Sequence, residues 1–250
     1  MEQKTISIVI PAYNEAQRIG KLLKEIRASV SNIKEVIVVF DGNDSTPEVV
    51  ETIYPDAKIL QYTRKLGKGM AVVKGIESAT GDMVAFIDAD GSISGSELER
   101  LKEFQKNDNF VIASRWLETS RVVGKQPLYR IFLGRIFHYF VFFIFRIPLK
   151  DTQCGLKIFN TRNAKSIIQK VQVYDWAFDV SMIYHGMEEG LTPKEIGITW
   201  LNESNSKLKV FTTVPRMFFS VVLMWIVNKH DRSFKMKNLI KLLKSKFEGL

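Results

Sequence analysis

A short apolar run that ends in two aspartates constrains this chain more than any other stretch. The run occupies residues 84–87, and Asp88-Ala89-Asp90-Gly91 follows it at once. An uninterrupted apolar run of this length is typical of a buried central strand. Alternate residues of an extended segment share a face, so the two carboxylates can converge on one hard cation. An ordinary strand end followed by a turn fits the same residues, because Asp and Gly are common in turns.

The rest of the first half alternates strand-like runs with segments of helical periodicity. Apolar runs typical of strands lie at residues 5–10, 35–40, 57–62 and 110–114. Helical segments are expected between them, over residues 15–30, from a cap at Ser45 or Thr46 with Pro47 in the first turn, and over residues 67–79 and 96–105. This alternation predicts an α/β fold with a mostly parallel sheet and helices on both faces. The carboxyl ends of parallel strands form one edge, and open α/β folds bind their ligands there.

The charge and the cysteine content narrow the class of partner and the compartment. The 250 residues include 36 Lys and Arg against 27 Asp and Glu, a formal net charge of +9. This excess favours a phosphorylated substrate, a nucleic acid or a membrane surface as partner. Cys154 is the only cysteine, which excludes an internal disulfide and predicts a reducing, cytoplasmic compartment. The N-terminal residues show no signal-peptide pattern.

Polar side chains cluster where the predicted strands end. They are Tyr13 to Glu15, Asp41 with Asp44, and Asp88 with Asp90. A set of oxygen ligands favours Mg²⁺ or Mn²⁺, and the scattered histidines and single cysteine argue against zinc. A Gly-Lys-Gly sequence centred on Lys68 opens a predicted helix, where backbone N–H groups can hold phosphate, although it lacks the spacing of a P-loop.

Six segments, in this order, resemble the family-2 glycosyltransferases with the Rossmann-like GT-A fold. They are IVIPAYNE at 8–15, FDGNDST at 40–46, GKGMAVVKG at 67–75, IDADGS at 87–92, DTQCGLKIF at 151–159 and WAFDVSM at 176–182. The last two are most similar to the polyprenyl-phosphate hexosyltransferases, in particular to the dolichyl-phosphate glucosyltransferase branch. The resemblance covers roughly residues 5–200. We therefore expect a GT-A domain over 1–210 and a C-terminal helix with a basic tail over 211–250.

The resemblance implies inverting transfer of a hexose from a nucleotide-sugar, foremost UDP-glucose, to a polyprenyl phosphate of the dolichyl type. In this family the Asp-x-Asp pair binds Mg²⁺ or Mn²⁺, which makes Asp88 and Asp90 the expected metal ligands. The expected donor-binding residues are Pro11, Ala12, Tyr13, Glu15, Asp41, Lys68, Asp88, Ala89, Asp90 and Gln153.

The acceptor side is less defined by motifs. Arg115, Arg130 and Arg135 are the candidate cations for the acceptor phosphate. Asp151 resembles a family aspartate near the reacting centre, where it would orient the acceptor or act as a base, and a turn residue is the alternative. Asp179 has a weaker claim, because it could simply start a helix.

Two positions favour a glucosyl donor. Phe40 replaces the first acid of the Asp-Asp-Gly of many relatives, and Ser92 stands where mannosyl-transferring relatives often carry Gln. A GDP-mannose-dependent enzyme, a nucleotidyltransferase and an inactive membrane- or nucleic-acid-binding module are the alternatives. The first strand lacks the glycine-rich basic loop of a nucleotidyltransferase. No nucleic-acid motif accompanies the basic residues, so we expect lipid and not nucleic acid as the partner of that charge.

Two apolar stretches, 136–145 and 217–227, bear on membrane association. Both fall short of the roughly 20 apolar residues that cross a bilayer, so we expect no crossing. As a helix, residues 130–146, within an insertion over 126–148, place Arg135, His138 and Arg146 on one arc and aromatic residues on the other. This pattern is typical of an interfacial helix, with a core helix or an oligomer contact as the alternative.

The C-terminal part predicts a second membrane contact. Residues 214–227 form another apolar helix, and the segment from Lys229 to Lys246 is rich in lysine. Each cation adds about 1 kcal/mol of attraction to an anionic leaflet. We therefore expect a peripheral, monotopic protein on the cytosolic face of a membrane with anionic lipids.

Overall fold

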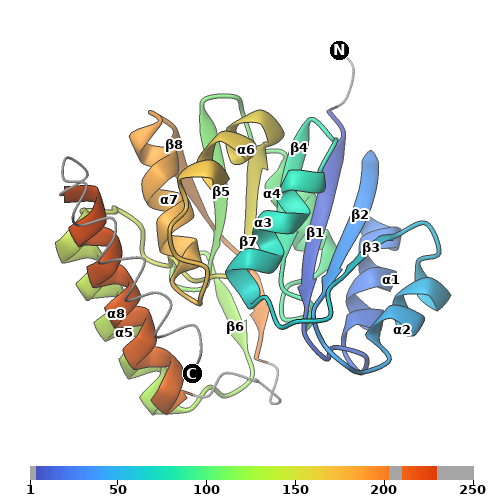
Figure 1. The fold of residues 1–250 in the computed structure, drawn as a ribbon, viewed down its shortest axis with the longest axis horizontal. Helices are drawn as coiled ribbons and strands as arrows, with labels where there is room; N and C mark the ends of the chain where they lie inside the picture. Colours follow the sequence, from blue (N-terminus) through green and yellow to red (C-terminus); the bar gives the residue numbers. More distant parts are fainter. Residues whose placement is uncertain (1–3, 203–209, 230–250) are drawn as a thin grey trace.

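A seven-stranded sheet forms the centre of the computed structural model, which describes residues 4–202 and 210–229 (Figure 1). A separate two-stranded sheet lies beside it. The strands are β1 (Ile6–Ala12), β2 (Ile33–Phe40), β3 (Lys58–Gln61), β4 (Met83–Ile87), β5 (Asn109–Ser114), β6 (Arg121–Val123), β7 (Leu156–Asn160), β8 (Thr192–Gly197) and β9 (Thr199–Leu201).

Helices connect most of the strands and cover both faces of the sheet (Figure 1). They are α1 (Ile19–Ser29), α2 (Thr46–Ile53), α3 (Lys68–Ser78), α4 (Gly95–Lys102), α5 (Leu128–Phe145), α6 (Thr161–Lys170), α7 (Phe178–Glu188) and α8 (Val210–Lys229). The predicted α/β class is confirmed, and so are the strands and helices expected over residues 5–114.

The order of strands in the main sheet is β3-β2-β1-β4-β7-β5-β8. β1 pairs in parallel with β2 and β4, with Ile8 opposite both Val36 and Ala85. β7 is inserted between β4 and β5 and runs antiparallel to both. The residues that precede β7 therefore lie at the same edge as the residues that follow β4 and β5, and this edge carries the candidate site.

The core has two parts, one on each face of the sheet, because successive residues of a strand point to opposite faces. Ile8 belongs to one buried cluster together with Leu22 of α1 and Leu98 of α4, whereas Val9 belongs to the other, together with Val72 of α3 and Ile183 of α7. The predicted apolar face of α1 is confirmed, since Ile19, Leu22, Leu23 and Ile26 are all buried. Both faces of the central strands are covered, as a parallel sheet requires.

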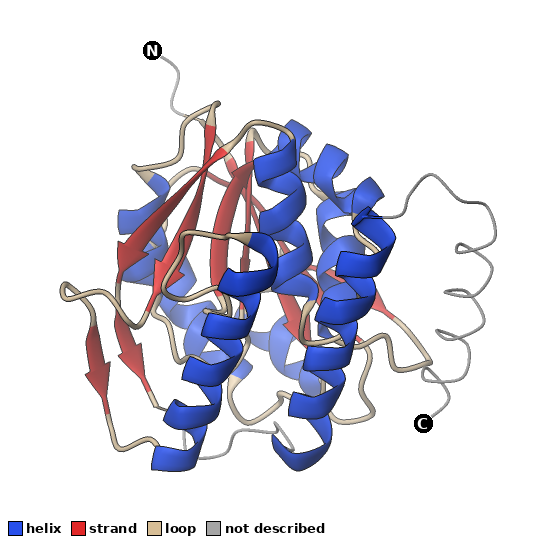
Figure 2. Ribbon diagram, turned by 90° about the vertical axis from the view of Figure 1, so that its left-hand side faces the viewer, coloured by secondary structure: helices blue, strands red, loops and turns tan. Residues whose placement is uncertain are grey.

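Helices α5 and α8 lie side by side at one end of the molecule (Figures 1 and 2). Phe218 of α8 contacts the rings of Phe137 and Phe140, and Ser220 donates a hydrogen bond to Asp175 at 2.6 Å. The second apolar helix that the sequence predicts is therefore present and docked on the body. The basic tail expected beyond it lies outside the described residues, and the domain boundary near 210 stays a prediction.

Half of the residues of α5 are exposed, which argues against its interpretation as a helix of the core. Only Phe137 and Val141 are buried, while Leu128, Phe132 and Phe143 have exposed fractions of 83%, 66% and 66%. The expectation that both apolar stretches are too short to cross a bilayer is wrong for α5. Its 18 residues are long and apolar enough by length and composition alone, because the helix begins eight residues before the stretch read from the sequence.

Candidate active site

The strand-end residues predicted from the sequence meet at one edge of the main sheet. Asp88 follows β4, and its backbone N–H donates to the carbonyl of Gly155, just before β7, at 3.1 Å. Asp41 follows β2, and its carboxylate accepts the N–H groups of Leu66 and Gly67, which precede α3. The ends of the parallel strands β2 and β4 and the start of the antiparallel strand β7 therefore share one edge, which brings together segments that are far apart in the sequence.

The first aspartate of the Asp-x-Asp pair faces Lys68. The Lys68 ammonium lies 2.9 Å from Oδ1 of Asp88, whose side chain is 33% exposed. Burial lowers the pKa of Lys68, but the nearby carboxylates of Asp88 and Asp179 outweigh it and raise this pKa, so the amine stays charged. Burial and the charge of Asp90 raise the pKa of Asp88 despite Lys68.

The acidic pair fits a divalent cation that is shared with a substrate. Within residues 4–202 and 210–229, no group of three or more His, Cys, Asp or Glu side chains is placed to hold a metal. Mg²⁺ commonly uses one or two carboxylates and takes its other ligands from phosphates and water. Asp88 and Asp90 supply that number, and all of their donor atoms are oxygens. Asp90 is partly fixed, because its Oδ1 accepts the N–H of Ser92 at 2.9 Å.

Gly155 gives the Asp88 carboxylate the space that it occupies. A Cβ at this position would lie only 2.1 Å from Oδ2 of Asp88. No side chain fits there without moving the carboxylate. The glycine of the DTQCGLKIF segment is therefore explained by its contact with the first aspartate of the pair.

The residues expected to hold the nucleoside differ in how exposed their side chains are. Tyr13 is 39% exposed, and the ammonium of Lys65 lies 4.0 Å from the centre of its ring. Glu15 is buried, and both of its carboxylate oxygens accept hydrogen bonds from Arg18 at 2.6 and 2.7 Å. Tyr13 therefore offers a surface to a ligand, whereas the carboxylate of Glu15 holds the chain that leads into α1.

The remaining residues expected on the donor side lie at the ends of β1, β2 and β4, and most of them are buried. Pro11 and Ala12 belong to β1, and the carbonyl of Ala12 accepts the N–H of Asp41 at 3.2 Å. Ala89 is buried between the two aspartates of the pair. Asp41 itself is buried beneath the loop that it holds. These residues thus contribute to the site through backbone hydrogen bonds and through the position of the loop before α3.

Arg115 and Asp151 form a buried ion pair next to the acidic pair. Asp151 is 1% exposed, and its carboxylate accepts hydrogen bonds from Nε, Nη2 and the backbone N–H of Arg115 at 2.7, 2.9 and 3.0 Å. Burial would raise the pKa of Asp151, but the charge and hydrogen bonds of Arg115 outweigh it and lower this pKa. The geometry favours orientation of Arg115 over action as a base, because both oxygens already accept hydrogen bonds.

Gln153 carries a buried donor without a partner. Its backbone N–H donates to Asp151 at 3.2 Å, while its Nε2 is buried with no hydrogen-bond partner among the described residues. Buried amide donors are rarely left unpaired. A substrate oxygen is the kind of group that would satisfy it.

Two of the three predicted arginines are brought together by Trp116. The Arg135 guanidinium lies 4.4 Å from the centre of this ring, and that of Arg115 lies 6.0 Å from it. Arg115 also lies 5.5 Å from the ring of Trp200, a residue that the sequence analysis missed. For Arg130 the described part of the chain shows no contact with this cluster, and its Nε is buried without a partner there.

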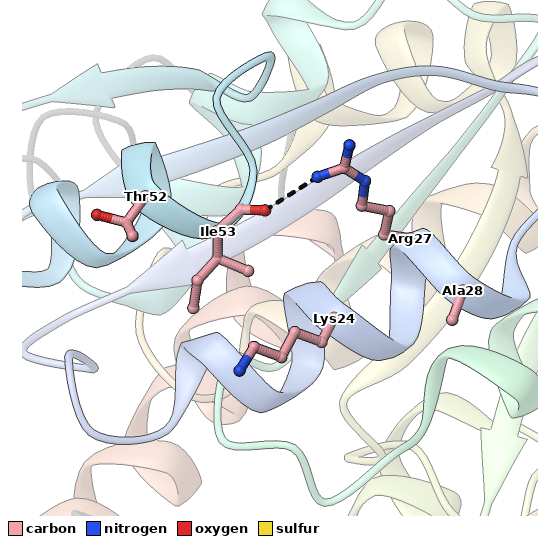
Figure 3. A pocket seen from close by; sticks show the side chains of 5 residues that line it. All are labelled: Lys24, Arg27, Ala28, Thr52 and Ile53. Carbon is pink, nitrogen blue, oxygen red and sulfur yellow. Dashed lines mark hydrogen bonds between the residues drawn. The ribbon is translucent and has the colours of Figure 1, made fainter.

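The hollow between α1 and α2 contains none of the predicted site residues (Figure 3). Lys24, Arg27, Ala28, Thr52 and Ile53 line it, and Arg27 donates to the carbonyl of Ile53 at 3.4 Å. It lacks carboxylates for a metal. The charged side chains predicted for the site lie instead at the edge of the main sheet where the strands end.

Comparison with known families settles the class of the protein. The model of glycosyl transferase family 2 matches residues 7–168, which include the Asp-x-Asp pair, Arg115 and Asp151. The chain belongs to this family. The resemblance read from its motifs is confirmed.

Individual relatives agree with this assignment. The chain is 29% identical to dolichyl-phosphate beta-glucosyltransferase of Drosophila melanogaster, over 88% of this chain and 74% of the relative. It is 30% identical to the enzyme of the same name from Dictyostelium discoideum, over 87% of this chain and 72% of the relative.

Solved structures confirm the GT-A-like fold. Glucosyl-3-phosphoglycerate synthase from Mycobacterium tuberculosis, in complex with Mn²⁺, UDP and glucosyl-3-phosphoglycerate, superposes with a TM-score of 0.68. The superposition covers 90% of this chain and 79% of that chain, at 16% sequence identity. A complex of the same enzyme with Mg²⁺ and UDP gives a TM-score of 0.67. At this identity the likeness concerns the fold.

We predict that Asp151→Asn destabilises the protein by about 3–5 kcal/mol at pH 7, because it leaves Arg115 buried without its counter-charge. Urea unfolding measures this difference, with the exposed Asp56→Asn as control. Because the folded protein lowers the pKa of Asp151, its contribution is present above its unfolded pKa of about 3.9 and is lost as the pH falls further. The difference between wild type and variant should therefore shrink below about pH 4, and a constant difference would contradict the ion-pair explanation.

Proposed function

We propose that the protein transfers glucose from UDP-glucose to a polyprenyl phosphate of the dolichyl type. The observation that carries the proposal is the pairing of two sites at one edge of the sheet. Asp88 and Asp90 offer carboxylates for a metal-bound diphosphate, and Arg115, with Asp151, offers a fixed cation for a second phosphate. The names of the Drosophila and Dictyostelium relatives support this choice of donor and acceptor.

Each group has a defined part in this reaction. When bound, Mg²⁺ or Mn²⁺ would offset the charge that gathers on the leaving diphosphate. Asp88 and Asp90 would hold the cation, and Lys68 would add a second positive charge at the same phosphates. Metal binding by the Mycobacterium tuberculosis enzyme, named in its complexes with Mn²⁺ and Mg²⁺, supports this part of the proposal.

The acceptor needs positioning more than it needs a base. A lipid phosphate is already anionic at neutral pH, so its oxygen can attack the sugar without losing a proton. Arg115 and Arg135 would hold this phosphate through charge-assisted hydrogen bonds, and the unpartnered amide of Gln153 would donate to an oxygen nearby. Asp151 would fix the direction of Arg115. Orientation and electrostatics would then supply most of the rate.

The exposed apolar face of α5 supports action at a membrane surface. Leu128, Phe132 and Phe143 are largely exposed, and Arg135 lies on the same helix beside the proposed acceptor site. A helix of this composition can bury its aromatic side chains at the boundary between headgroups and acyl chains. The lipid phosphate would then meet Arg115 without leaving the membrane. We place the protein peripherally on the cytosolic face, with anionic lipids attracting its excess positive charge.

We predict that Asp90→Asn weakens UDP binding in the presence of Mn²⁺ at least tenfold, because it removes one of two carboxylates from the cation. Isothermal titration calorimetry with Mn²⁺ and with EDTA separates the metal-dependent part. The variant with Mn²⁺ should bind UDP as the wild type does in EDTA, and should still unfold cooperatively. The exposed Asp108→Asn serves as control. Unchanged UDP binding by Asp90→Asn would contradict the proposed metal site.

We predict that Phe132→Ser combined with Phe143→Ser lowers binding to vesicles at least tenfold, because burying each ring in lipid contributes about 1.5–3 kcal/mol. Flotation with vesicles of phosphatidylcholine and phosphatidylserine measures this change. UDP binding should stay unchanged, which shows that the fold is intact. Unchanged flotation, with dissociation of an oligomer in sedimentation, would instead identify this face as a contact between copies of the chain.

A further inference from the structure

A lysine is completely buried inside the main sheet, where a charged group is stable only with a counter-charge or hydrogen-bond partners. Lys157 is the second residue of β7, pairs in register with Phe86 of β4 and Ile112 of β5, and is 0% exposed. Its ammonium donates to the carbonyl of Cys154 at 2.8 Å and to Oδ1 of Asp179 at 2.5 Å. Burying a charge is costly unless it is paired. Lys157 therefore depends on Asp179.

The second oxygen of Asp179 faces the lysine of the proposed donor site. Oδ2 lies 3.7 Å from the ammonium of Lys68, which lies 2.9 Å from Asp88. Positive and negative groups thus alternate from Lys157 through Asp179 and Lys68 to Asp88. This series of charges runs from the interior of the sheet to the partly exposed carboxylate of Asp88.

Backbone packing fixes the distance between the two helices that carry Lys68 and Asp179. The N–H of Gly69, in the first turn of α3, donates to the carbonyl of Tyr174 at 3.1 Å. A Cβ on Gly69 would lie 2.7 Å from Cβ of Phe178, the first residue of α7. The starts of α3 and α7 therefore touch, and Trp176 lies beside the Lys68 ammonium, 5.7 Å from its ring centre.

Asp179 does not serve as the cap of α7, which was its alternative interpretation. The N–H of Ala177 donates to Oδ1 of Asp175, and the N–H of Phe178 donates to the backbone carbonyl of Asp175. The two oxygens of the Asp179 carboxylate face the ammonium groups of Lys68 and Lys157. Its position is thus explained by the two ammonium groups and not by the start of the helix.

We propose that Asp179 is a positioning residue for the donor: it retains Lys68 at the diphosphate when a cation takes the Asp88 carboxylate. Without the donor, Lys68 neutralises Asp88. Lys68 would lose this counter-charge when Asp88 holds a divalent cation, and Asp179 would then be the carboxylate that keeps the ammonium in the site. Lys157 holds Asp179 in place and supplies its counter-charge from below. The inference rests on the proposed function, because it needs a nucleotide diphosphate at Asp88 and Asp90.

The test separates positioning from a purely structural role by means of two variants. Asp179→Asn leaves Lys157 buried without a counter-charge and should destabilise the fold. Combining Asp179→Leu with Lys157→Met replaces the whole buried pair by apolar side chains, which is often neutral or stabilising. The combined variant should therefore unfold in urea near the wild-type midpoint.

The same combined variant should still bind UDP with Mn²⁺ about tenfold more weakly than wild type, since Lys68 has lost a charged partner. In transfer assays its KM for the donor should rise while its KM for the acceptor stays unchanged. Adding Lys68→Met to it should cause no further loss, because Asp179 acts through Lys68. Calorimetry of UDP with Mn²⁺ measures all of these variants.

A combined variant that binds UDP as tightly as wild type would overturn the inference and leave the proposed function standing. A further tenfold loss on adding Lys68→Met would also overturn it, because the two residues would then act independently. Wild-type protein that binds no UDP with Mn²⁺ would instead overturn the proposed function, and the inference with it.

Discussion

The candidate site depends on positive charge held against carboxylates at the edge of the sheet. Lys68 faces Asp88, and Arg115 faces Asp151, and both pairs lie where strands of the main sheet end. Charged groups that are poorly solvated interact strongly, so the two members of each pair hold each other in position. One pair places a partly exposed carboxylate where we propose a cation binds, while the other orients the guanidinium that we propose binds an anion. In the proposed reaction, the two phosphate-binding functions would thus rest on two ion pairs of the same kind.

The antiparallel strand β7 is what brings these two pairs together. It enters the sheet between β4 and β5, so the segment from Asp151 to Gly155 lies beside the end of β4. A parallel strand at this place would put that segment at the opposite edge, away from Asp88. The same strand carries Lys157 into the core. The antiparallel strand and the segment that leads into it therefore supply Asp151, which pairs with Arg115, Gly155, which leaves space for Asp88, and the buried Lys157.

The donor half of the site could be predicted from the sequence, because its residues follow strands with clear apolar patterns. Asp88 and Asp90 come directly after a buried run, and a parallel sheet places such residues at one edge. The acceptor half could not be derived in this way. The strand Leu156–Asn160 contains a lysine and does not belong to the regular strand–helix alternation of the first half of the chain. Its antiparallel direction was therefore not predictable from periodicity. Trp116 and Trp200 were missed for a similar reason, since their contact with Arg115 depends on tertiary packing alone.

The account is tested most directly by sugar transfer to a short polyprenyl phosphate with Mn²⁺ or Mg²⁺, with UDP-glucose and GDP-mannose offered in parallel. We expect transfer from UDP-glucose and none from GDP-mannose, and none from either donor in EDTA. Transfer from GDP-mannose alone would keep the arrangement of charges and contradict the donor. Release of nucleotide without a glycosylated lipid would contradict the acceptor that we assign to Arg115 and Arg135.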